Sequence, residues 1–334
     1  MSENFDPLKL AQTHLAHARR IVFFTGAGMS AESGIPTFRD ALTGLWAHYD
    51  PEQLATPQGF LHDPSLVWGW YEWRRMRALQ ALPNAGHRAI AEFAARHHNS
   101  GVDVATNVIT QNVDDLHECA GSTDVTHLHG SLFAHRCFRC ASPARVEDII
   151  ETPDEPEGGR RLNPPHCRHC SDLIRPGVVW FGEALPAASL DRATTLINEC
   201  DVLVVVGTSG VVQPAASLVS GAIAMNKAVI VVDPHASAWQ NGVLHLCSTA
   251  ASAVPMLLTA PADTTAFASA HKPAYTADSW ENDGFLSTNE AMLRKVNRET
   301  DLTLFKARIR PEQLPDPKNR RAYRRWLKAH GHTL

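Results

Sequence analysis

The chain has 334 residues, of which 44% are hydrophobic and 20% are charged. This balance excludes an intrinsically disordered protein, and the length suffices for one sizeable domain with an accessory one. The first six residues are polar and acidic, and the longest apolar runs have the length of a strand, so the sequence predicts neither a signal peptide nor a membrane span. We therefore expect a cytoplasmic protein.

An alternation of helices and buried strands begins at the N-terminus. Apolar residues at helical spacing predict a helix over residues 7–20, and the uninterrupted apolar run at residues 21–25 predicts a strand buried on both faces. Gly26-Ala27-Gly28 follows directly and lets the backbone turn sharply beside a ligand. The pattern is neither GxGxxG nor a Walker loop, so on its own this turn could equally close a strand-helix corner.

The middle of the chain continues the same pattern. Asp63 followed by Pro64 announces a helix to about residue 82, rich in aromatic side chains, and residues 87–97 predict another. A strand over residues 103–110 then ends at the polar cluster 111–115. Because ligands of open α/β sheets lie outside the carboxyl ends of the strands, this cluster and the turn at Gly26 are expected to face one crevice.

A second strand-helix-strand unit follows. Residues 201–206 and 228–232 predict strands, with a helix over residues 214–225 between them. Such short connections indicate the parallel, right-handed crossover unit. The sequence therefore predicts an α/β fold built on a parallel sheet.

Four of the seven cysteines form two Cys-x2-Cys pairs that are 26 residues apart. In a chain without a secretory signal this spacing indicates a tetrahedral thiolate zinc site rather than disulfides, and four thiolates leave no open position for water. We expect a structural zinc in a small module that needs the metal in order to fold. The ligands are Cys137, Cys140, Cys167 and Cys170. The scattered Cys119, Cys200 and Cys247 are expected in the core.

Residues 261–334 change in composition, first to Ala, Thr and Ser and then to charge. From Arg294 to Leu334 there are twelve Lys or Arg against four Asp or Glu. Basic residues interleaved with aromatics could bind nucleic acid, although a solvated or self-docking C-terminal helix is the favoured interpretation. The role of this linker and basic extension stays open.

Six motifs, taken together and in this order, resemble those of the sirtuins, the NAD-dependent protein deacylases. They occupy residues 26–39, 110–114, 127–130, the two cysteine pairs, 178–183 and 207–209. The resemblance runs over residues 7–258, roughly three quarters of the chain. It implies a catalytic domain at residues 1–260, in which a small zinc module at about residues 131–180 is inserted into a Rossmann-type NAD domain. Acyl-lysine proteins would bind in the cleft between them.

The resemblance also implies residue roles. His129 would be the general base, which suits an imidazole because its ordinary pKa lies near working pH. His127 has no such role and is left as structural. The peptide would add a strand to Val179, Phe181 and Gly182. The residues expected to bind NAD are Gly26, Ala27, Gly28, Phe38, Arg39, Gln111, Asn112, Asp114, Gly207, Thr208, Ser209 and Asp233. The reaction of the family would give free lysine, nicotinamide and 2'-O-acyl-ADP-ribose.

Two features concern affinity and specificity. Asp233 stands where sirtuins usually carry asparagine, and a carboxylate near phosphates adds unfavourable charge, so NAD affinity could be reduced. Tyr71 and Arg74, one helical turn apart, together with the small Ala55 resemble the subclass that removes succinyl, malonyl and glutaryl groups. A guanidinium binds a carboxylate bidentately, which suits an acidic acyl chain.

Two alternatives belong to other classes of function. The same NAD site could serve a mono-ADP-ribosyltransferase or an NAD hydrolase. A non-enzymatic alternative is an NAD-sensing module that the basic extension tethers to nucleic acid. A general base at His129 argues against that alternative, because binding alone requires no base.

Overall fold

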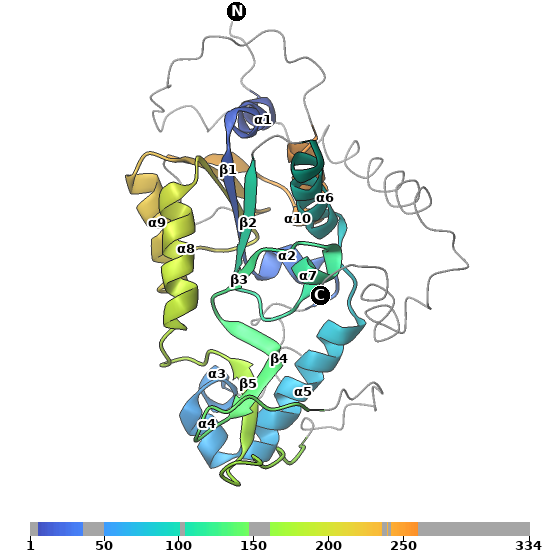
Figure 1. Ribbon diagram of the computed structural model, residues 1–334, viewed down its shortest axis with the longest axis vertical. Helices are drawn as coiled ribbons and strands as arrows, with labels where there is room; N and C mark the ends of the chain where they lie inside the picture. The colour runs from blue at the N-terminus through green and yellow to red at the C-terminus, as the bar shows by residue number, and fades with distance from the viewer. Residues whose placement is uncertain are drawn as a thin grey trace, which may run out of the picture.

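The computed structural model describes residues 6–35, 50–100, 104–146, 161–235, 239 and 242–259. Phe38 and Arg39, which were predicted to bind NAD, lie outside the described residues, as does the basic extension at residues 261–334. Figure 1 shows a larger lobe built on one sheet and, below it, a smaller lobe with a sheet of its own.

The larger lobe is built on a six-stranded sheet in which every neighbouring pair of strands is parallel. Its order is β3-β2-β1-β6-β7-β8. The strands are β1 (Arg20–Thr25), β2 (Ala105–Thr110), β3 (Val125–His127), β6 (Val202–Val206), β7 (Ala228–Val232) and β8 (Leu244–Leu246). The direction of strand succession reverses between β1 and β6, and in Rossmann-type sheets the ligand crevice lies at that point.

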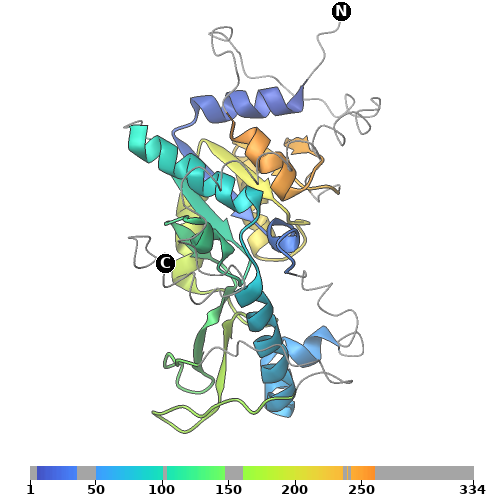
Figure 2. The same ribbon diagram turned by 90° about the vertical axis from the view of Figure 1, so that its right-hand side faces the viewer.

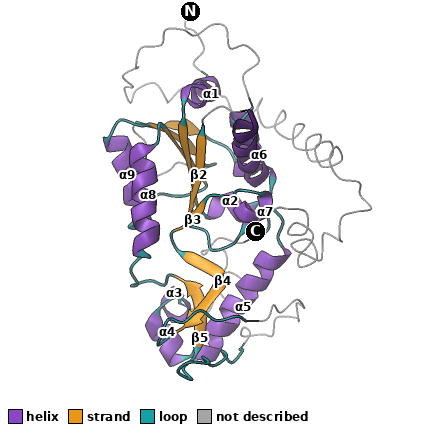
Figure 3. Cartoon of the chain, viewed as in Figure 1, coloured by secondary structure: helices purple, strands orange, loops and turns teal. Residues whose placement is uncertain are grey.

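Alternate residues of the central strands point to opposite faces of the sheet, and helices cover both faces (Figure 3). Ile21 and Phe23 of β1 pack with α1 (Pro7–His17), α6 (Ala85–Ser100) and α10 (Ala250–Leu257). Val22 and Phe24 pack with α8 (Ala187–Glu199) and α9 (Ala215–Ala224). This double burial explains the uninterrupted apolar run in the sequence.

The elements expected from the sequence are present, with ends that differ by a few residues. The helix at residues 63–82 is α5 (Pro64–Gln80), and the side chain of Asp63 accepts a hydrogen bond from the Leu66 backbone N–H at its start. The expectation that Cys119, Cys200 and Cys247 are core residues is confirmed for the first two, whereas Cys247 is exposed. Cys247 directly follows the edge strand β8, and its Sγ donates to the Pro234 carbonyl over 3.3 Å at the surface.

The smaller lobe combines the antiparallel strands β4 (Gly130–Cys137) and β5 (Ile174–Val178) with three helices. These are α3 (Pro51–Leu54), α4 (Pro57–His62) and α5. Leu54, Phe60, Trp70, Leu132 and Trp180 are buried in their common core. The zinc module was expected to have too little core to fold without the metal. Helices α3, α4 and α5, which precede β2 in the sequence, supply apolar side chains to its core.

Figure 2 shows α5 running from the junction of the lobes to the bottom of the smaller one. Within that lobe the buried carboxylate of Glu72 accepts hydrogen bonds from Arg75 on the same helix and lies 3.3 Å from His135 Nε2 on β4. Because a buried charge is tolerated only when it is paired, this cluster fixes α5 against β4. In the described part of the chain, none of the helices combines the length and apolar character needed to cross a membrane.

Candidate functional site

A cavity of about 910 Å³ opens at the carboxyl ends of β1 and β6 and extends to the smaller lobe. The predicted NAD residues that line it are Gly26, Ala27, Gly28, Gln111, Asn112, Asp114, Gly207, Thr208, Ser209 and Asp233. The predicted substrate residues Ala55, Tyr71, Arg74, Val179, Phe181 and Gly182 line it as well, and so does His129. The structure thus brings together every predicted site residue that it describes, apart from the cysteines.

Two glycine-containing loops form the floor of the cavity and contact each other through their backbones. The N–H of Gly28 donates to the carbonyl of Gly207 over 2.8 Å, and a Cβ at Gly28 would come within 2.7 Å of Gly207 Cα. Gly207 also has φ of +62°, in the left-handed region that favours glycine. Close approach of the two loops therefore requires these glycines, and α2 (Ala27–Ala31) begins at this contact.

The segment after β2 forms one wall, and its polar side chains are held by hydrogen bonds. Gln111 Nε2 donates to Thr208 Oγ1 over 3.0 Å, which joins the ends of β2 and β6. The side-chain amide of Asn112 donates to Ser30 Oγ over 3.0 Å. The buried Asp114 accepts from the Leu116 backbone N–H at the start of α7 (Leu116–Ala120). These contacts preorganise amide and carboxylate groups at the cavity wall.

His129 lies between the end of β3 and the start of β4, where the chain passes from one lobe to the other. Its Nδ1 lies 3.0 Å from the carbonyl oxygen of Gln111. A carbonyl can only accept, so Nδ1 carries the proton and Nε2 of the neutral ring has an available lone pair. Burial lowers the pKa of His129 from its ordinary value of 6.5, although the hydrogen bond to Gln111 opposes the shift. The imidazole is therefore neutral at pH 7.

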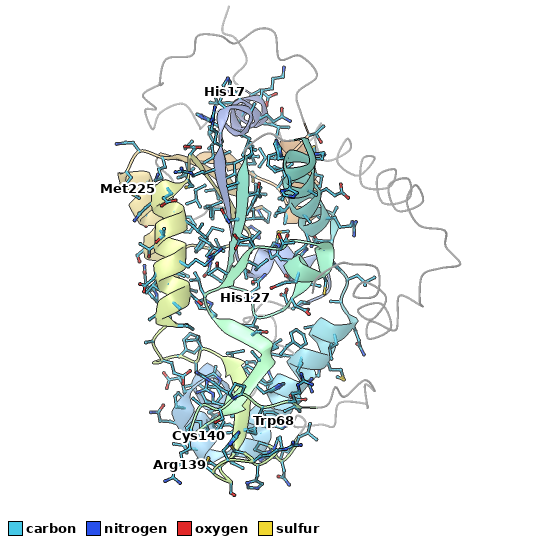
Figure 4. All side chains as sticks on the ribbon, in the orientation of Figure 1. His17, Trp68, His127, Arg139, Cys140 and Met225 are labelled. Carbon is cyan, nitrogen blue, oxygen red and sulfur yellow. The ribbon has the colours of Figure 1, made fainter. Side chains whose placement is uncertain are left out.

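His127, two residues earlier, has the opposite electrostatic character. Its Nε2 lies 2.7 Å from Glu118 Oε1, and its Nδ1 lies 3.1 Å from the carbonyl oxygen of Asn112. Burial opposes protonation, but the hydrogen bond to Glu118 outweighs it and raises the pKa of His127. Figure 4 shows His127 at the junction of the two lobes. It does not line the cavity, and its Nδ1 contacts the backbone carbonyl of Asn112. This placement is consistent with the structural role expected from the sequence.

At the end of the cavity that the smaller lobe provides, Tyr71 and Arg74 lie together on α5. The guanidinium of Arg74 lies over the Trp70 and Tyr71 rings, at 5.0 and 5.8 Å from their centroids. Burial raises the pKa of Tyr71 to about 12, so its hydroxyl keeps its proton. Ala55 is buried beside them and leaves space in the cavity. This end of the cavity therefore offers a cation and a hydroxyl among aromatic rings.

The segment after β5 borders the cavity between these groups and His129. Two of its backbone N–H groups are already used, since Val179 donates to the His129 carbonyl and Phe181 donates to the Ala55 carbonyl, both over 2.9 Å. The carboxylate of Glu183 accepts the Trp180 N–H over 2.8 Å. This segment thus joins the catalytic candidate His129 to the acyl end of the cavity. Phe181 is half exposed at its rim.

Asp233 lies at the end of β7 and directs one carboxylate oxygen into its own loop, where the His235 backbone N–H donates to it over 2.9 Å. This hydrogen bond offsets part of the negative charge that the cavity would otherwise experience. The expectation that a carboxylate in place of an amide lowers NAD affinity stays a prediction.

The four paired cysteines lie together at the far end of the smaller lobe (Figure 4). All four Sγ atoms lie within 4.8 Å of one another, with 3.4 Å between Cys137 and Cys170 and 3.7 Å between Cys140 and Cys167. Zinc-sulfur bonds of about 2.3 Å place tetrahedral sulfur ligands about 3.8 Å apart. The donor set therefore fits a zinc ion, and none of the four cysteines lines the cavity, which suits a structural metal.

Several residues of the site were not expected from the sequence. Ser30 holds Asn112, while Leu132, Trp180 and Val211 line the cavity. Trp180 stood within a recognised motif, so that motif could have drawn attention to it. Nothing in the local sequence marks Leu132 or Val211, because their positions depend on how the lobes pack.

Residues 26–214 match the model of the Sir2 family. NAD-dependent protein deacylase 1 of Pseudomonas aeruginosa is 59% identical over 66% of this chain and 85% of its own length. An NAD-dependent protein deacylase of Methylococcus capsulatus is 51% identical over 74% of this chain and 94% of its own.

Solved structures agree with this. A Sir2 homologue in complex with NAD is 44% identical with a TM-score of 0.65, covering 75% of this chain and 91% of the homologue. A Sir2 variant in complex with a deacetylated p53 peptide and 3'-O-acetyl-ADP-ribose is 29% identical with a TM-score of 0.61, covering 75% and 97%. The matching fold, motifs and relatives show that this chain belongs to the Sir2 family, the sirtuins.

Proposed function

We propose that this sirtuin is an NAD-dependent protein-lysine deacylase with a preference for acidic acyl groups: succinyl, malonyl and glutaryl. The observation that carries the proposal is a single cavity. Its glycine loops, the neutral imidazole of His129 and the Tyr71-Arg74 pair all line it. Relatives named NAD-dependent protein deacylase, at 59% and 51% identity, support the general activity.

The residues present fit NAD as the co-substrate. The loops at Gly26 and Gly207 lie at the switch point of the sheet, and side chains at these glycines would collide with the opposite loop. Gly26, Ala27, Gly28, Gly207, Thr208 and Ser209 would hold the phosphates and adenosine. Gln111, Asn112 and Asp114 would hold the nicotinamide and its ribose. When bound, NAD supplies the electrophilic sugar carbon that receives the acyl oxygen as nicotinamide departs.

The protein's own contribution to proton transfer is made by His129. Its Nδ1–H is directed to the Gln111 carbonyl, so Nε2 is the atom that accepts a proton from a ribose hydroxyl. The carbonyl also stabilises the imidazolium that results, because Nδ1 keeps its hydrogen bond in both protonation states. Partial burial in the cavity lowers the pKa of His129 and so favours the neutral ring.

The pH dependence of kcat/KM tests this state of the base. The pKa of His129 is lowered, so the neutral form is present above that pKa and is lost only as the pH falls through it. We expect the acid limb of the profile, measured with a succinyl-lysine peptide from about pH 5 to pH 9, to have its midpoint below 6.5. A midpoint above the ordinary histidine value would contradict the assignment.

The substrate backbone is proposed to bind along the segment from Val179 to Gly182 as an added strand. Because the N–H groups of Val179 and Phe181 donate within the chain, the peptide would pair with carbonyl oxygens of this segment and with Gly182. Main-chain recognition of this kind is tolerant of the peptide sequence, which suits an enzyme with many protein substrates.

The acidic preference follows from the charge at the acyl end of the cavity. A succinyl or malonyl chain ends in a carboxylate, which the planar guanidinium of Arg74 can bind bidentately while the Tyr71 hydroxyl donates a third hydrogen bond. An acetyl group is too short to reach these groups and offers them no charge. The small side chain of Ala55 leaves room for the longer acyl chain.

Replacement of Arg74 by methionine should affect desuccinylation and deacetylation to different degrees. Hydrogen bonds to charged groups contribute about 1.5–3 kcal/mol, so Arg74→Met should lower kcat/KM for a succinyl-lysine peptide roughly 10- to 150-fold. Deacetylation should change far less, because the acetyl group has no distal carboxylate. The measurement is kcat/KM for the two peptides with the same sequence.

Arg192→Met is the matched control, since Arg192 lies on α8 and the change removes an equal charge from its exposed ion pair with Asp124. It should leave the ratio of the two activities unchanged, because exposed ion pairs contribute little. Equal losses of desuccinylation and deacetylation in Arg74→Met would refute the acidic preference.

The fate of NAD distinguishes the alternative activities. Mass spectrometry should detect acyl-ADP-ribose and unmodified lysine from a deacylase, modified protein from an ADP-ribosyltransferase, and free ADP-ribose from a hydrolase. A panel of acetyl-, malonyl- and succinyl-lysine peptides therefore tests the activity and its preference together. Binding of nucleic acid by the extension at residues 261–334 stays a prediction, for which a salt-dependent gel shift is the test.

A further inference from the structure

Trp180 makes a contact with the acyl end of the cavity that depends on its indole nitrogen. Its Nε1–H donates to the hydroxyl oxygen of Tyr71 over 3.0 Å. Both side chains are almost fully buried, with exposed fractions of 2% and 3%, and both line the cavity. An indole N–H is a donor and never an acceptor, so the direction of this hydrogen bond is fixed and Tyr71 Oη must accept.

The fixed direction determines where the proton of Tyr71 can point. Conjugation keeps a phenolic O–H near the plane of its ring, which leaves two orientations. The Trp180 N–H occupies one side of the oxygen, so the Tyr71 proton takes the other side. Among the described residues Tyr71 Oη donates to no other group. Burial raises the pKa of Tyr71 to about 12, so the proton is present throughout the neutral range.

Trp180 is itself held on its ring and on its backbone by one partly buried ion pair. The guanidinium of Arg175 lies 3.4 Å from the centroid of the Trp180 ring, and its Nη2 donates to Glu183 Oε2 over 2.9 Å. The same Glu183 oxygen accepts the backbone N–H of Trp180. Arg175 also donates to the Val178 carbonyl over 2.9 Å. The indole therefore has little freedom to turn away from Tyr71.

We propose that Trp180 is a positioning residue for acyl specificity, which orients the Tyr71 hydroxyl so that its proton is presented to the distal carboxylate of an acidic acyl group beside Arg74. The inference rests on the proposed preference for acidic acyl groups and adds a residue to it. Trp180 would not touch that carboxylate itself. Its effect on specificity would pass entirely through Tyr71.

This dependence predicts a specific pattern in a double-mutant cycle. Trp180→Phe deletes the N–H and frees the hydroxyl to turn, so the ratio of kcat/KM for succinyl- over acetyl-lysine peptide should fall roughly 2- to 10-fold, the factor that one neutral hydrogen bond contributes. Tyr71→Phe should lower the ratio by at least as much. In the Tyr71→Phe background, Trp180→Phe should not lower it further.

A binding measurement, a control variant and a second substitution at Trp180 complete the test. Dissociation constants of both peptides, measured by titration calorimetry, should show the same loss of selectivity for the succinyl peptide. Trp239→Phe is the matched control, because this buried indole donates to Ser220 Oγ over 3.2 Å but does not line the cavity, and it should leave the ratio unchanged. If Trp180→Phe does not fold, Trp180→3-benzothienylalanine removes the N–H within a ring of nearly the same shape.

The outcomes separate this inference from the proposed function. If the parent protein shows no preference for succinyl over acetyl, the acidic-acyl proposal fails. If the preference is present but the effect of Trp180→Phe on the ratio is as large in the Tyr71→Phe background as in the parent, Trp180 acts by packing and the inference is overturned. A ratio that is unchanged in Trp180→Phe also overturns it.

Discussion

His129→Ala is expected to lower kcat about 10²- to 10⁴-fold, the usual contribution of a positioned acid-base group. The substitution removes an imidazole that lines the cavity. Its Nδ1–H is fixed by the Gln111 carbonyl, so its Nε2 is the atom available to accept a proton. The backbone carbonyl of His129 still accepts from Val179, so the fold should be retained. Steady-state deacylation with saturating NAD and peptide measures the loss.

The control is His17→Ala, at the end of α1 and far from the junction of the lobes (Figure 4), which should leave kcat unchanged. Circular dichroism and zinc content should match the parent for both variants. A His129→Ala protein that is folded and fully active would remove the basis for the proposed chemistry.

Cys137→Ser is expected to remove zinc and unfold the smaller lobe. Structural zinc contributes apparent free energies of about 10–16 kcal/mol, which is comparable to or larger than the whole stability of a typical protein at about 5–15 kcal/mol. Cys137 is buried between Trp68, Ile174 and the other thiolates, so its replacement disturbs both metal and packing. The melting temperature should fall strongly and the zinc content should approach zero.

Cys247→Ser supplies the comparison, because it changes an exposed thiol outside the cluster and should preserve both zinc and melting temperature. Removal of the metal from the parent protein with a chelator should reproduce the effect of Cys137→Ser. If the substituted protein instead keeps one equivalent of zinc and its melting temperature, the four thiolates do not act as one site.

The larger lobe was largely predictable because its signals are local. The apolar runs at residues 21–25, 202–206 and 228–232 can be satisfied only by strands buried on both faces, and those strands form. Asp63 followed by Pro64 marks the start of α5 through a hydrogen bond within four residues. The spacing of the four cysteines was likewise sufficient to predict that they lie together at one metal site.

What could not be predicted depends on contacts between distant segments. β3 and β8 have three residues each, too few for a periodic pattern, and they form because β2 and β7 offer an edge. The membership of α5 in the smaller lobe follows from its packing with β4 and β5. The glycines of the first loop were expected either to let the backbone turn beside a ligand or to close a strand-helix corner, and the sequence did not announce that Gly28 is required by its contact with Gly207.

Contacts between segments that are distant in the sequence also limit what could be predicted of the site. His129, Gln111 and the glycine loops could be predicted as parts of one site, because each of them lies in a motif that is continuous in the sequence. The hydrogen bond between Trp180 and Tyr71 joins residues 109 positions apart, and nothing around either residue announces it. Specificity that depends on such a contact becomes visible only once α5 and the segment after β5 have packed together in the smaller lobe.

The backbone and the side chain of His129 are attached to different lobes. Its carbonyl accepts from Val179 beside β5, while its Nδ1–H donates to Gln111 at the edge of the six-stranded sheet. A movement of one lobe relative to the other would therefore have to break one of these two hydrogen bonds, so together they resist a hinge motion at this point. The position of the imidazole thus depends on both lobes at once, and it is maintained only while the lobes keep this arrangement.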